Sequence, residues 1–394
     1  MQRSLAGLVV VGAVLSGCGG DDQGGNEDET AGETAGDGDT GDGDSGDGDG
    51  DGDDPSGDGD ADPSGDGDAD PTGDGDTEPG PAGIFVAVGD GGRRASSTDG
   101  ETWAELIGTG TVDTQAEEGE EDILRAIAVG SEPPVLVAVG GGGTDWTGNA
   151  MIMRSTDGTT WDEDLVGGVD GVDGRKLTAV AWLPASDAFV AGGHQAHLLR
   201  SSDAGQTWTR VYPEHPSDTT VYGIAGLDDG TVVAVGAHKD AWDAPKVAYV
   251  HRSEDGGQSF AAPSFFGDDG DQLIAVASDG QTFVAVGPQQ CLRSGDGLDW
   301  QPCGLTGSGY GAVSFTRDRF VVTYLDGVST SQDGENWSVH VESSTGVPAE
   351  VVFGNGLYMG VRFYDRGSSP TLGEWSWVSQ SGYPLRDIAF LPLE

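Results

Sequence analysis

The stretch Ser155-Thr-Asp-Gly-Thr-Thr-Trp161 recurs along this 394-residue chain, and no other feature limits the possible folds as strongly. Each copy has a Ser, an Asp two residues later, a Gly and then an aromatic residue. A seventh, degenerate copy without the Asp is expected at Ser379–Tyr383. The Ser, Asp and aromatic positions of the six full copies are Ser97, Asp99 and Trp103; Ser155, Asp157 and Trp161; Ser201, Asp203 and Trp208; Ser253, Asp255 and Phe260; Ser294, Asp296 and Trp300; and Ser331, Asp333 and Trp337.

These residue types are typical of a tight turn. An Asp side chain can accept hydrogen bonds from backbone N–H groups two or three residues ahead, and Gly can adopt a positive φ. The aromatic residue then begins the returning strand and has a large apolar face to bury. Each copy therefore predicts a β-hairpin whose turn is stabilised by a carboxylate, which makes the six aspartates structural.

Two strand patterns precede each copy and complete a four-stranded unit. We name its strands a to d, and the repeated turn joins c to d. Residues 84–394 hold seven units of about 44 residues, a period typical of propeller blades. The chain begins with a b strand and ends with an a strand, so we expect 386–390 to pair with 84–89 and close the ring. The fold expected is all-β, a single β-propeller of seven four-stranded blades. The b strands expected begin at Ile84, Val135, Ala188, Thr231, Thr282, Arg319 and Gly356, and the a strands at Arg125, Thr178, Tyr222, Leu273, Gly311, Ala349 and Arg386.

The repeated turn resembles the Asp-box, or bacterial neuraminidase repeat, of the sialidase-like and photosystem II assembly factor-like propellers. The resemblance implies either a glycosidase or a ring that acts by binding. A sialidase would need three arginines around a substrate carboxylate, whereas Arg362 and Arg366 supply two, and Tyr212 with Glu214 is a weak nucleophile pair. Xyloglucanase-type enzymes have two tandem rings, and this chain has one. We therefore expect a non-catalytic protein- or glycan-binding or scaffold module, with a sialidase-like or xyloglucanase-like glycoside hydrolase as the alternative.

The N-terminal segment resembles a bacterial lipoprotein signal. Residues 1–18 contain Arg3, a short apolar run and the sequence Leu15-Ser-Gly-Cys18, which is similar to a lipobox. The resemblance implies lipidation of Cys18 and a lipid-anchored extracytoplasmic protein, with the outer membrane favoured; the alternative is an ordinary secretory signal with a chance Cys.

A low-complexity acidic linker follows at residues 19–83. It has 24 acidic and no basic residues between Asp21 and Gly80, and almost nothing apolar, so we expect a disordered stalk. Calcium binding by this linker or by the acidic loops is the weaker alternative, and no other cofactor is expected.

The remaining domain, residues 84–394, is itself acidic. Removing the 24 linker acids and Arg3 from the chain total of 68 acidic and 18 basic residues leaves 44 against 17. This balance argues against nucleic acid and anionic lipid as partners, and we expect a monomer. Cys291 and Cys303 stand three residues outside Ser294 and Trp300, so the hairpin register places them opposite one another. We expect a disulfide, with two buried free thiols as the alternative.

The loops opposite the repeated turns are the expected ligand face, because loops vary where strands repeat. The long b–c loops expected are 141–150, 237–246 and 362–373. The candidate ligand residues in them are Trp146, Trp242, Arg362, Tyr364 and Arg366. Aromatic rings and guanidinium groups suit stacking and carboxylate binding, although the same residues could instead pack the loops. His194 and His197 lack an identifiable third metal ligand, so no metal site is predicted.

Overall fold

The computed structural model describes residues 82–106, 122–142, 150–162, 176–212, 218–240, 244–267, 270–307, 309–325, 327–342, 346–379 and 384–393. Within these ranges the chain forms 27 β-strands and one short 3₁₀ helix, η1 (Pro184–Ser186). The all-β prediction is confirmed. The predicted signal with Cys18, the acidic linker, Trp146 and Trp242 lie outside the described residues.

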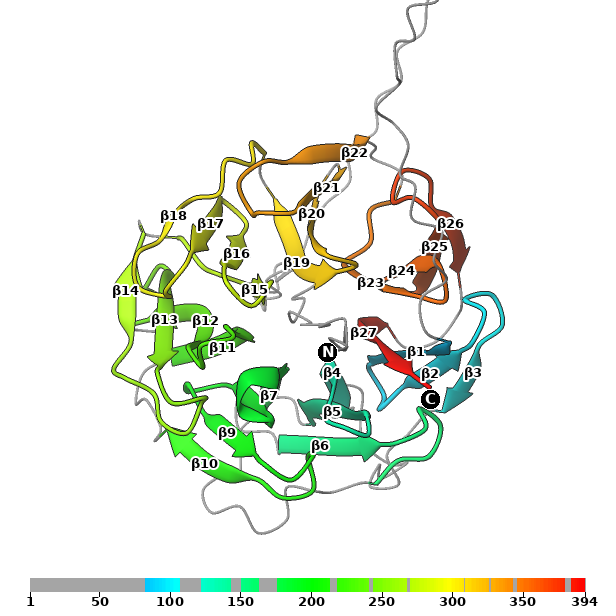
Figure 1. Ribbon diagram of the computed structural model, residues 1–394, viewed down its shortest axis with the longest axis horizontal. Helices are drawn as coiled ribbons and strands as arrows, with labels where there is room; N and C mark the ends of the chain where they lie inside the picture. Colours follow the sequence, from blue (N-terminus) through cyan, green and yellow to red (C-terminus); the bar gives the residue numbers. More distant parts are fainter. Residues whose placement is uncertain are drawn as a thin grey trace, which may run out of the picture. The chain divides into compact units, whose positions relative to one another are not determined.

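Seven antiparallel sheets surround a common centre (Figure 1), as the repeat predicts. In each sheet strand a is innermost and strand d outermost. From a to d, blade 1 has β27 (Leu385–Pro392), β1 (Gly83–Gly89), β2 (Arg94–Ser97) and β3 (Ala104–Leu106); blade 2 has β4 (Ile123–Gly130), β5 (Val135–Gly141) and β6 (Ala150–Ser155); blade 3 has β7 (Leu177–Leu183), β8 (Ala188–Gly193), β9 (Leu198–Ser201) and β10 (Thr209–Tyr212); blade 4 has β11 (Asp218–Gly226), β12 (Val232–Lys239), β13 (Val247–Ser253) and β14 (Ser264–Phe266); blade 5 has β15 (Ala275–Ser278), β16 (Phe283–Gly287), β17 (Gln290–Ser294) and β18 (Gln301–Pro302); blade 6 has β19 (Tyr310–Thr316), β20 (Arg319–Tyr324), β21 (Gly327–Ser331) and β22 (Ser338–Glu342); and blade 7 has β23 (Glu350–Gly354), β24 (Leu357–Arg362), β25 (Asp365–Ser369) and β26 (Ser376–Ser379). In blade 2 the described residues form three strands, and Arg154 and Asp162 form an isolated bridge on the outer side of β6.

The C-terminal strand closes the ring, as predicted. β27 pairs with β1 in an antiparallel register that places Phe85 opposite Phe390 and Ala87 opposite Ile388. β27 also contacts β4 of blade 2 and β23 of blade 7, so the innermost strands form an unbroken circle of neighbours. Pairing with β27 therefore covers the edge of β1 that would otherwise be unpaired.

Small and branched apolar side chains explain how the sheets pack. Five of the seven b strands have a buried Ala at one position: Ala87, Ala138, Ala191, Ala234 and Ala285. Apolar clusters join adjacent blades; one, for example, contains Val86 of blade 1 and Leu136 of blade 2. The continuous core therefore lies between the blades.

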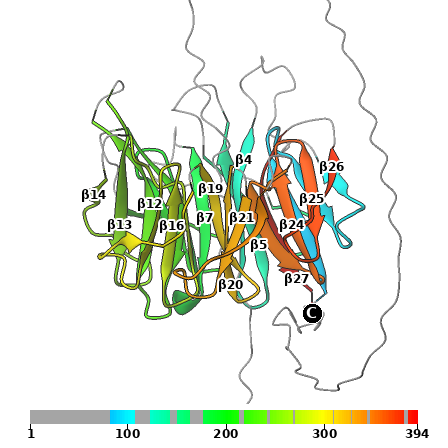
Figure 2. The same cartoon turned by 90° about the horizontal axis from the view of Figure 1, so that it is seen from above.

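The strands run between two faces of the ring (Figure 2). We call the face that carries the c–d turns the turn face. The opposite face, which carries the b–c and d–a connections, is the loop face.

Two predictions about blade 7 are wrong. Its c–d turn is not at Ser379–Tyr383 but at 369–375, because β25 ends at Ser369 and β26 begins at Ser376. In this turn Thr371 and Leu372 stand where the other copies have Asp and Gly, so the pattern was not recognisable. The segment 362–373 is accordingly not a long loop, since Arg362 pairs with Asp365 across a two-residue turn.

Candidate functional site

The repeated turns are held by their Ser and Asp side chains. In blade 1 the Asp99 Oδ1 accepts hydrogen bonds from the N–H groups of Glu101 (2.8 Å) and Thr102 (2.7 Å). The Ser97 hydroxyl donates to Asp99 Oδ1 (2.9 Å) and accepts from the Gly100 N–H (2.8 Å). The same Ser–Asp hydrogen bond is present in the other five turns, from Ser155, Ser201, Ser253, Ser294 and Ser331.

These hydrogen bonds keep the turn carboxylates ionised. The N–H groups of Thr102 and Glu101 and the Ser97 hydroxyl lower the pKa of Asp99 to about 2. The pKa values of Asp157, Asp203, Asp255, Asp296 and Asp333 are also lowered by hydrogen bonds to their carboxylates. A general acid needs a raised pKa, so these aspartates are suited to structure and not to proton transfer.

Each turn also packs against the preceding blade. Gly158 has φ +71°, and a Cβ atom there would lie 2.9 Å from Val86 Cγ2 in blade 1. The matching glycines of the other five turns pack on the same strand b position: Gly100 on Met359, Gly205 on Val137, Gly257 on Val190, Gly297 on Val233 and Gly334 on Val284. The Gly of the motif is therefore required both by the turn and by the contact between blades.

An arginine precedes the turn Ser in blades 2 to 5 and binds the turn of the next blade. Arg154 Nε donates to the Ala204 carbonyl (2.8 Å), Arg200 Nε to that of Gly256 (3.1 Å), and Arg252 Nε to that of Asp296 (2.7 Å). Arg293 instead forms an ion pair with Glu335 (2.9 Å). These four arginines join blades, so they do not converge on one ligand.

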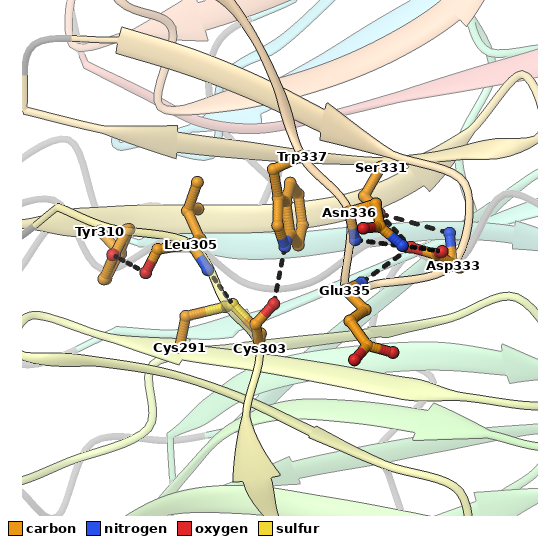
Figure 3. Close-up of a disulfide and its surroundings, with 9 residues drawn as sticks. All are labelled: Cys291, Cys303, Leu305, Tyr310, Ser331, Asp333, Glu335, Asn336 and Trp337. Atoms are coloured by element: carbon orange, nitrogen blue, oxygen red, sulfur yellow. Dashed lines mark hydrogen bonds between the residues drawn. A yellow bond between two sulfur atoms is a disulfide. The ribbon is translucent and has the colours of Figure 1, made fainter.

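Cys291 and Cys303 are joined by a disulfide between strand c and the residues after β18 in blade 5 (Figure 3). The Cys303 carbonyl accepts a hydrogen bond from the Trp337 indole of blade 6 (2.9 Å). The bond therefore stabilises both the outer hairpin of blade 5 and its contact with the next turn.

A groove of about 620 Å³ lies beside the turns of blades 4 and 5. Its lining includes Arg252, Asp255, Phe260 and Leu298. Arg252 and Asp255 already bond within the turns, so this groove presents few polar groups to a ligand.

On the loop face, the most exposed aromatic side chains among the described residues lie on blade 7. Phe363 and Tyr364 form the two-residue turn between β24 and β25, and their side chains are 54% and 48% exposed. Phe363 has φ +41°, a conformation that costs a non-Gly residue of order 1–3 kcal/mol. Leu325 of blade 6 is also exposed on this face. Because such strain clusters at functional sites, this turn is the best candidate for a binding site.

Two arginines lie near this turn at the loop-face ends of strand a. Arg386 pairs with both oxygens of Asp90 (2.7 Å each), and its neighbour Leu385 donates its N–H to the Phe363 carbonyl (2.5 Å). Arg125 occupies the same β-bulge position in blade 2. Its Nε has no hydrogen-bond partner among the described residues, and burial and the charge of Arg386 lower its pKa. A β-bulge changes the direction of the side chain at that position. The guanidinium groups of Arg125 and Arg386 are therefore turned away from the regular ladder of the sheet.

The predicted ligand residues are only partly brought together. Tyr364 is exposed on the turn, whereas Arg362 pairs with Asp365 (2.9 Å) and lies 4.0 Å from the Trp377 ring. Arg366 lies inside β25, almost fully buried, bonded to Glu105 and 4.8 Å from the Trp103 ring. It joins blade 7 to blade 1, so a direct ligand contact by Arg366 does not fit this geometry. Phe363, Arg386 and Arg125 were not singled out from the sequence. The two arginines were visible as departures from the repeat, whereas no turn signal marked Phe363.

Blade 4 has a chain of hydrogen bonds from a hydroxyl through an imidazole to a carboxylate. Its hydroxyl is buried and its carboxylate is exposed, which does not suit catalysis. Thr219 Oγ1 bonds His238 Nδ1 (2.8 Å), and His238 Nε2 bonds Asp240 (3.0 Å). Thr219 is buried while Asp240 is 95% exposed. A nucleophile must be accessible and its orienting carboxylate sheltered, which is the reverse arrangement.

In the part of the chain that the structure describes, no three His, Cys, Asp or Glu side chains are grouped to hold a metal ion. The described residues also include no helix with the length and apolar character needed to cross a membrane.

Comparison with protein-family models and with curated proteins finds no match. Several solved structures are similar at low identity. YCF48 bound to D1 peptide is 15% identical over 78% of this chain and 94% of that one, with a TM-score of 0.46. YCF48 from Cyanidioschyzon merolae is 17% identical over 68% of this chain and 89% of that one (TM-score 0.45). U3-55K is 10% identical over 80% of this chain and all of that one (TM-score 0.49).

Proposed function

We propose that the ring is a non-catalytic binding module that holds a segment of a partner protein on the loop face of blades 7 and 1. One observation carries this proposal: Phe363 and Tyr364 are exposed together on a strained two-residue turn whose backbone is bonded to Leu385, the neighbour of Arg386. The exposed half of each aromatic side chain leaves apolar area open to a partner, and strained backbone of this kind clusters at binding sites.

The chemistry of the turn and of the neighbouring arginines suits a protein partner. Tyr and Arg are the residue types that dominate binding energy at protein interfaces, and Phe adds apolar area. Arg386 is already oriented by Asp90, so little conformational entropy is lost when its remaining N–H groups meet a carbonyl or carboxylate. Arg125 adds a desolvated cation from the next blade.

Three features favour binding over hydrolysis. The turn aspartates have lowered pKa values, with Asp99 at about 2, and the Thr219–His238–Asp240 chain has its nucleophile buried. Glu350 and Asp387, which adjoin on blades 7 and 1, are fully buried and out of reach of a sugar. A retaining glycosidase needs two close carboxyls that both reach its substrate.

The lipobox-like sequence and the acidic linker supply the cellular setting of the proposal. Lipidated Cys18 would anchor the chain to an extracytoplasmic membrane face, with the outer membrane favoured, and residues 19–83 would hold a monomeric ring away from the lipid.

Crosslinking from the loop face tests the proposed site. The photo-crosslinking amino acid benzoylphenylalanine is placed at Tyr364 or, as a matched control on the turn face, at Leu298, which is 61% exposed. In cells that express the full chain, position 364 should give a discrete protein adduct that Phe363→Ser removes, and position 298 should not. Adducts of equal yield at both positions, or adducts at position 298 alone, contradict the proposed site. Glycan arrays with the same protein check for a sugar ligand.

A further inference from the structure

Two acidic residues replace small ones at a single position of the repeat. At the aligned position of strand a, five blades have Ala126, Ala179, Gly223, Ala275 and Ala312. Blade 7 has Glu350 and blade 1 has Asp387. A side chain here points toward strand a of the next blade, where space is small: a Cβ on Gly223 would lie 2.9 Å from the Val276 backbone nitrogen.

Both acidic side chains are fully buried, but only Asp387 accepts hydrogen bonds of normal geometry. Asp387 accepts hydrogen bonds from the N–H groups of Ile127 in blade 2 (2.8 Å) and of Ile388 (2.7 Å). Among the described residues, no donor meets either oxygen of Glu350 at normal hydrogen-bond geometry. A buried carboxyl without a partner is costly unless it is neutral, so a proton or another group must compensate Glu350.

The charged groups around the pair are engaged elsewhere. Arg386, next to Asp387 in β27, pairs with Asp90, and Arg362 at the end of β24 pairs with Asp365. Arg125 of β4 interacts with Arg386, Asp90 and Tyr222. Ser314 of β19 donates its hydroxyl to the Val351 carbonyl (2.9 Å). Among the described residues no Lys, Arg or His forms an ion pair with either carboxyl.

Two carboxyls in such a site cannot both be ionised. Burial, followed by the charge of Asp387, raises the pKa of Glu350 well above its ordinary value, and the Val351 N–H and the Ser314 hydroxyl oppose this shift to a smaller extent. Burial also raises the pKa of Asp387, but its two N–H donors oppose this shift. The retained proton therefore belongs to Glu350.

We propose that Glu350 keeps its proton at neutral pH and donates it to Asp387, and that loss of this proton to solvent at higher pH loosens the binding turn of blade 7. The connection between the carboxyl pair and the turn is short, because Asp387 lies two residues from Leu385. The Leu385 N–H donates to the Phe363 carbonyl. A raised folded-state pKa means that this stabilisation is complete below the unfolded pKa of Glu350 and is lost as pH rises through the folded pKa. Only the effect on the turn rests on the proposed function.

Carbon-13 NMR of the full chain, labelled at Glu side-chain carboxyls, tests the proton directly. Glu350→Gln assigns the signal. If that variant does not fold, the signal whose midpoint moves most in Asp387→Asn identifies Glu350. At pH 7 the signal should have the chemical shift of a protonated carboxyl, and Ca²⁺ should not change it. A carboxylate shift at pH 7, or a Ca²⁺-dependent change, overturns the inference while leaving the proposed function untouched.

Hydrogen exchange of the Leu385 N–H tests the effect on the turn. At each pH the chain is compared with Glu350→Gln, so the intrinsic pH dependence of exchange cancels. Above the folded pKa of Glu350, protection should fall relative to this variant by up to tenfold per pH unit. Glu254→Gln, at an exposed glutamate, is the control and should leave the ratio flat. A flat ratio for Glu350→Gln as well would refute the link to the turn.

Discussion

Replacing Leu372 by Gly, the residue that the other six turns have at this position, should destabilise the ring. Leu372 occupies the Gly position of the blade 7 turn with φ +68°, yet its side chain is 1% exposed and packs with Val321, Val328, Val351 and Tyr358. Leu372→Gly relieves left-handed strain of about 1–2 kcal/mol. It also removes a buried side chain whose truncation typically costs about 2–5 kcal/mol.

The second effect is larger, so we expect Leu372→Gly to lose about 2 kcal/mol of unfolding free energy. Leu372→Ala keeps the strain and loses the packing, so it should be less stable than Leu372→Gly by about 1 kcal/mol. Urea unfolding followed by tryptophan fluorescence measures both, since Trp375 donates its indole N–H to the Leu372 carbonyl (3.1 Å). If Leu372→Gly were as stable as the natural chain, packing would not be what retains Leu at this position.

Four further predictions follow from the turns, the hairpin and the closure. Asp157→Ala should lower stability by about 1 kcal/mol, the scale of a lost cap bond, and leave loop-face crosslinking intact; loss of the crosslink would show that the turn face takes part. Phe363→Gly should raise the thermal midpoint by relieving strain and should abolish the position 364 adduct, whereas a lower midpoint would show that Phe363 packs within the ring. Mass spectrometry of non-reduced protein from an oxidising compartment should find Cys291 bonded to Cys303, and reduction should cost about 3 kcal/mol for a loop of this size; two free thiols there would contradict the bond. Truncation before Leu385 removes β27 and should abolish cooperative thermal unfolding, so a truncated chain that melts like the whole ring would refute closure by this strand.

The fold was predictable because its local signals repeat. Each strand pattern and six of the seven turns use the same residue types. The interpretation of Ser155–Trp161 as a hairpin turn therefore applies to the other five copies as well. The turn at 369–375 was missed because its conformation is maintained by the burial of Leu372, a tertiary effect that turn propensities do not contain.

The candidate site was harder to predict for the same reason. Phe363 and Tyr364 make a tight turn without Gly, Asn or Asp, so no turn signal marked them. Arg366 was an expected ligand contact, but pairing with Glu105 across the blades buries it. Glu350 and Asp387 were visible as departures from an Ala position, and their significance depends on spacing between blades that the sequence does not reveal.

The arginines between blades give the ring an uneven resistance to force. They join blade 2 to 3, 3 to 4, 4 to 5 and 5 to 6. At the equivalent position blades 6, 7 and 1 have Thr330, Ser368 and Ser96. The arc from blade 6 to blade 2, which carries the chain closure and the exposed aromatic turn, is held by different contacts, among them the Arg366–Glu105 ion pair between blades 7 and 1. Pulling by a bound partner on the aromatic turn would then load this buried ion pair, whereas the opposite arc resists through hydrogen bonds from arginines to turn carbonyls.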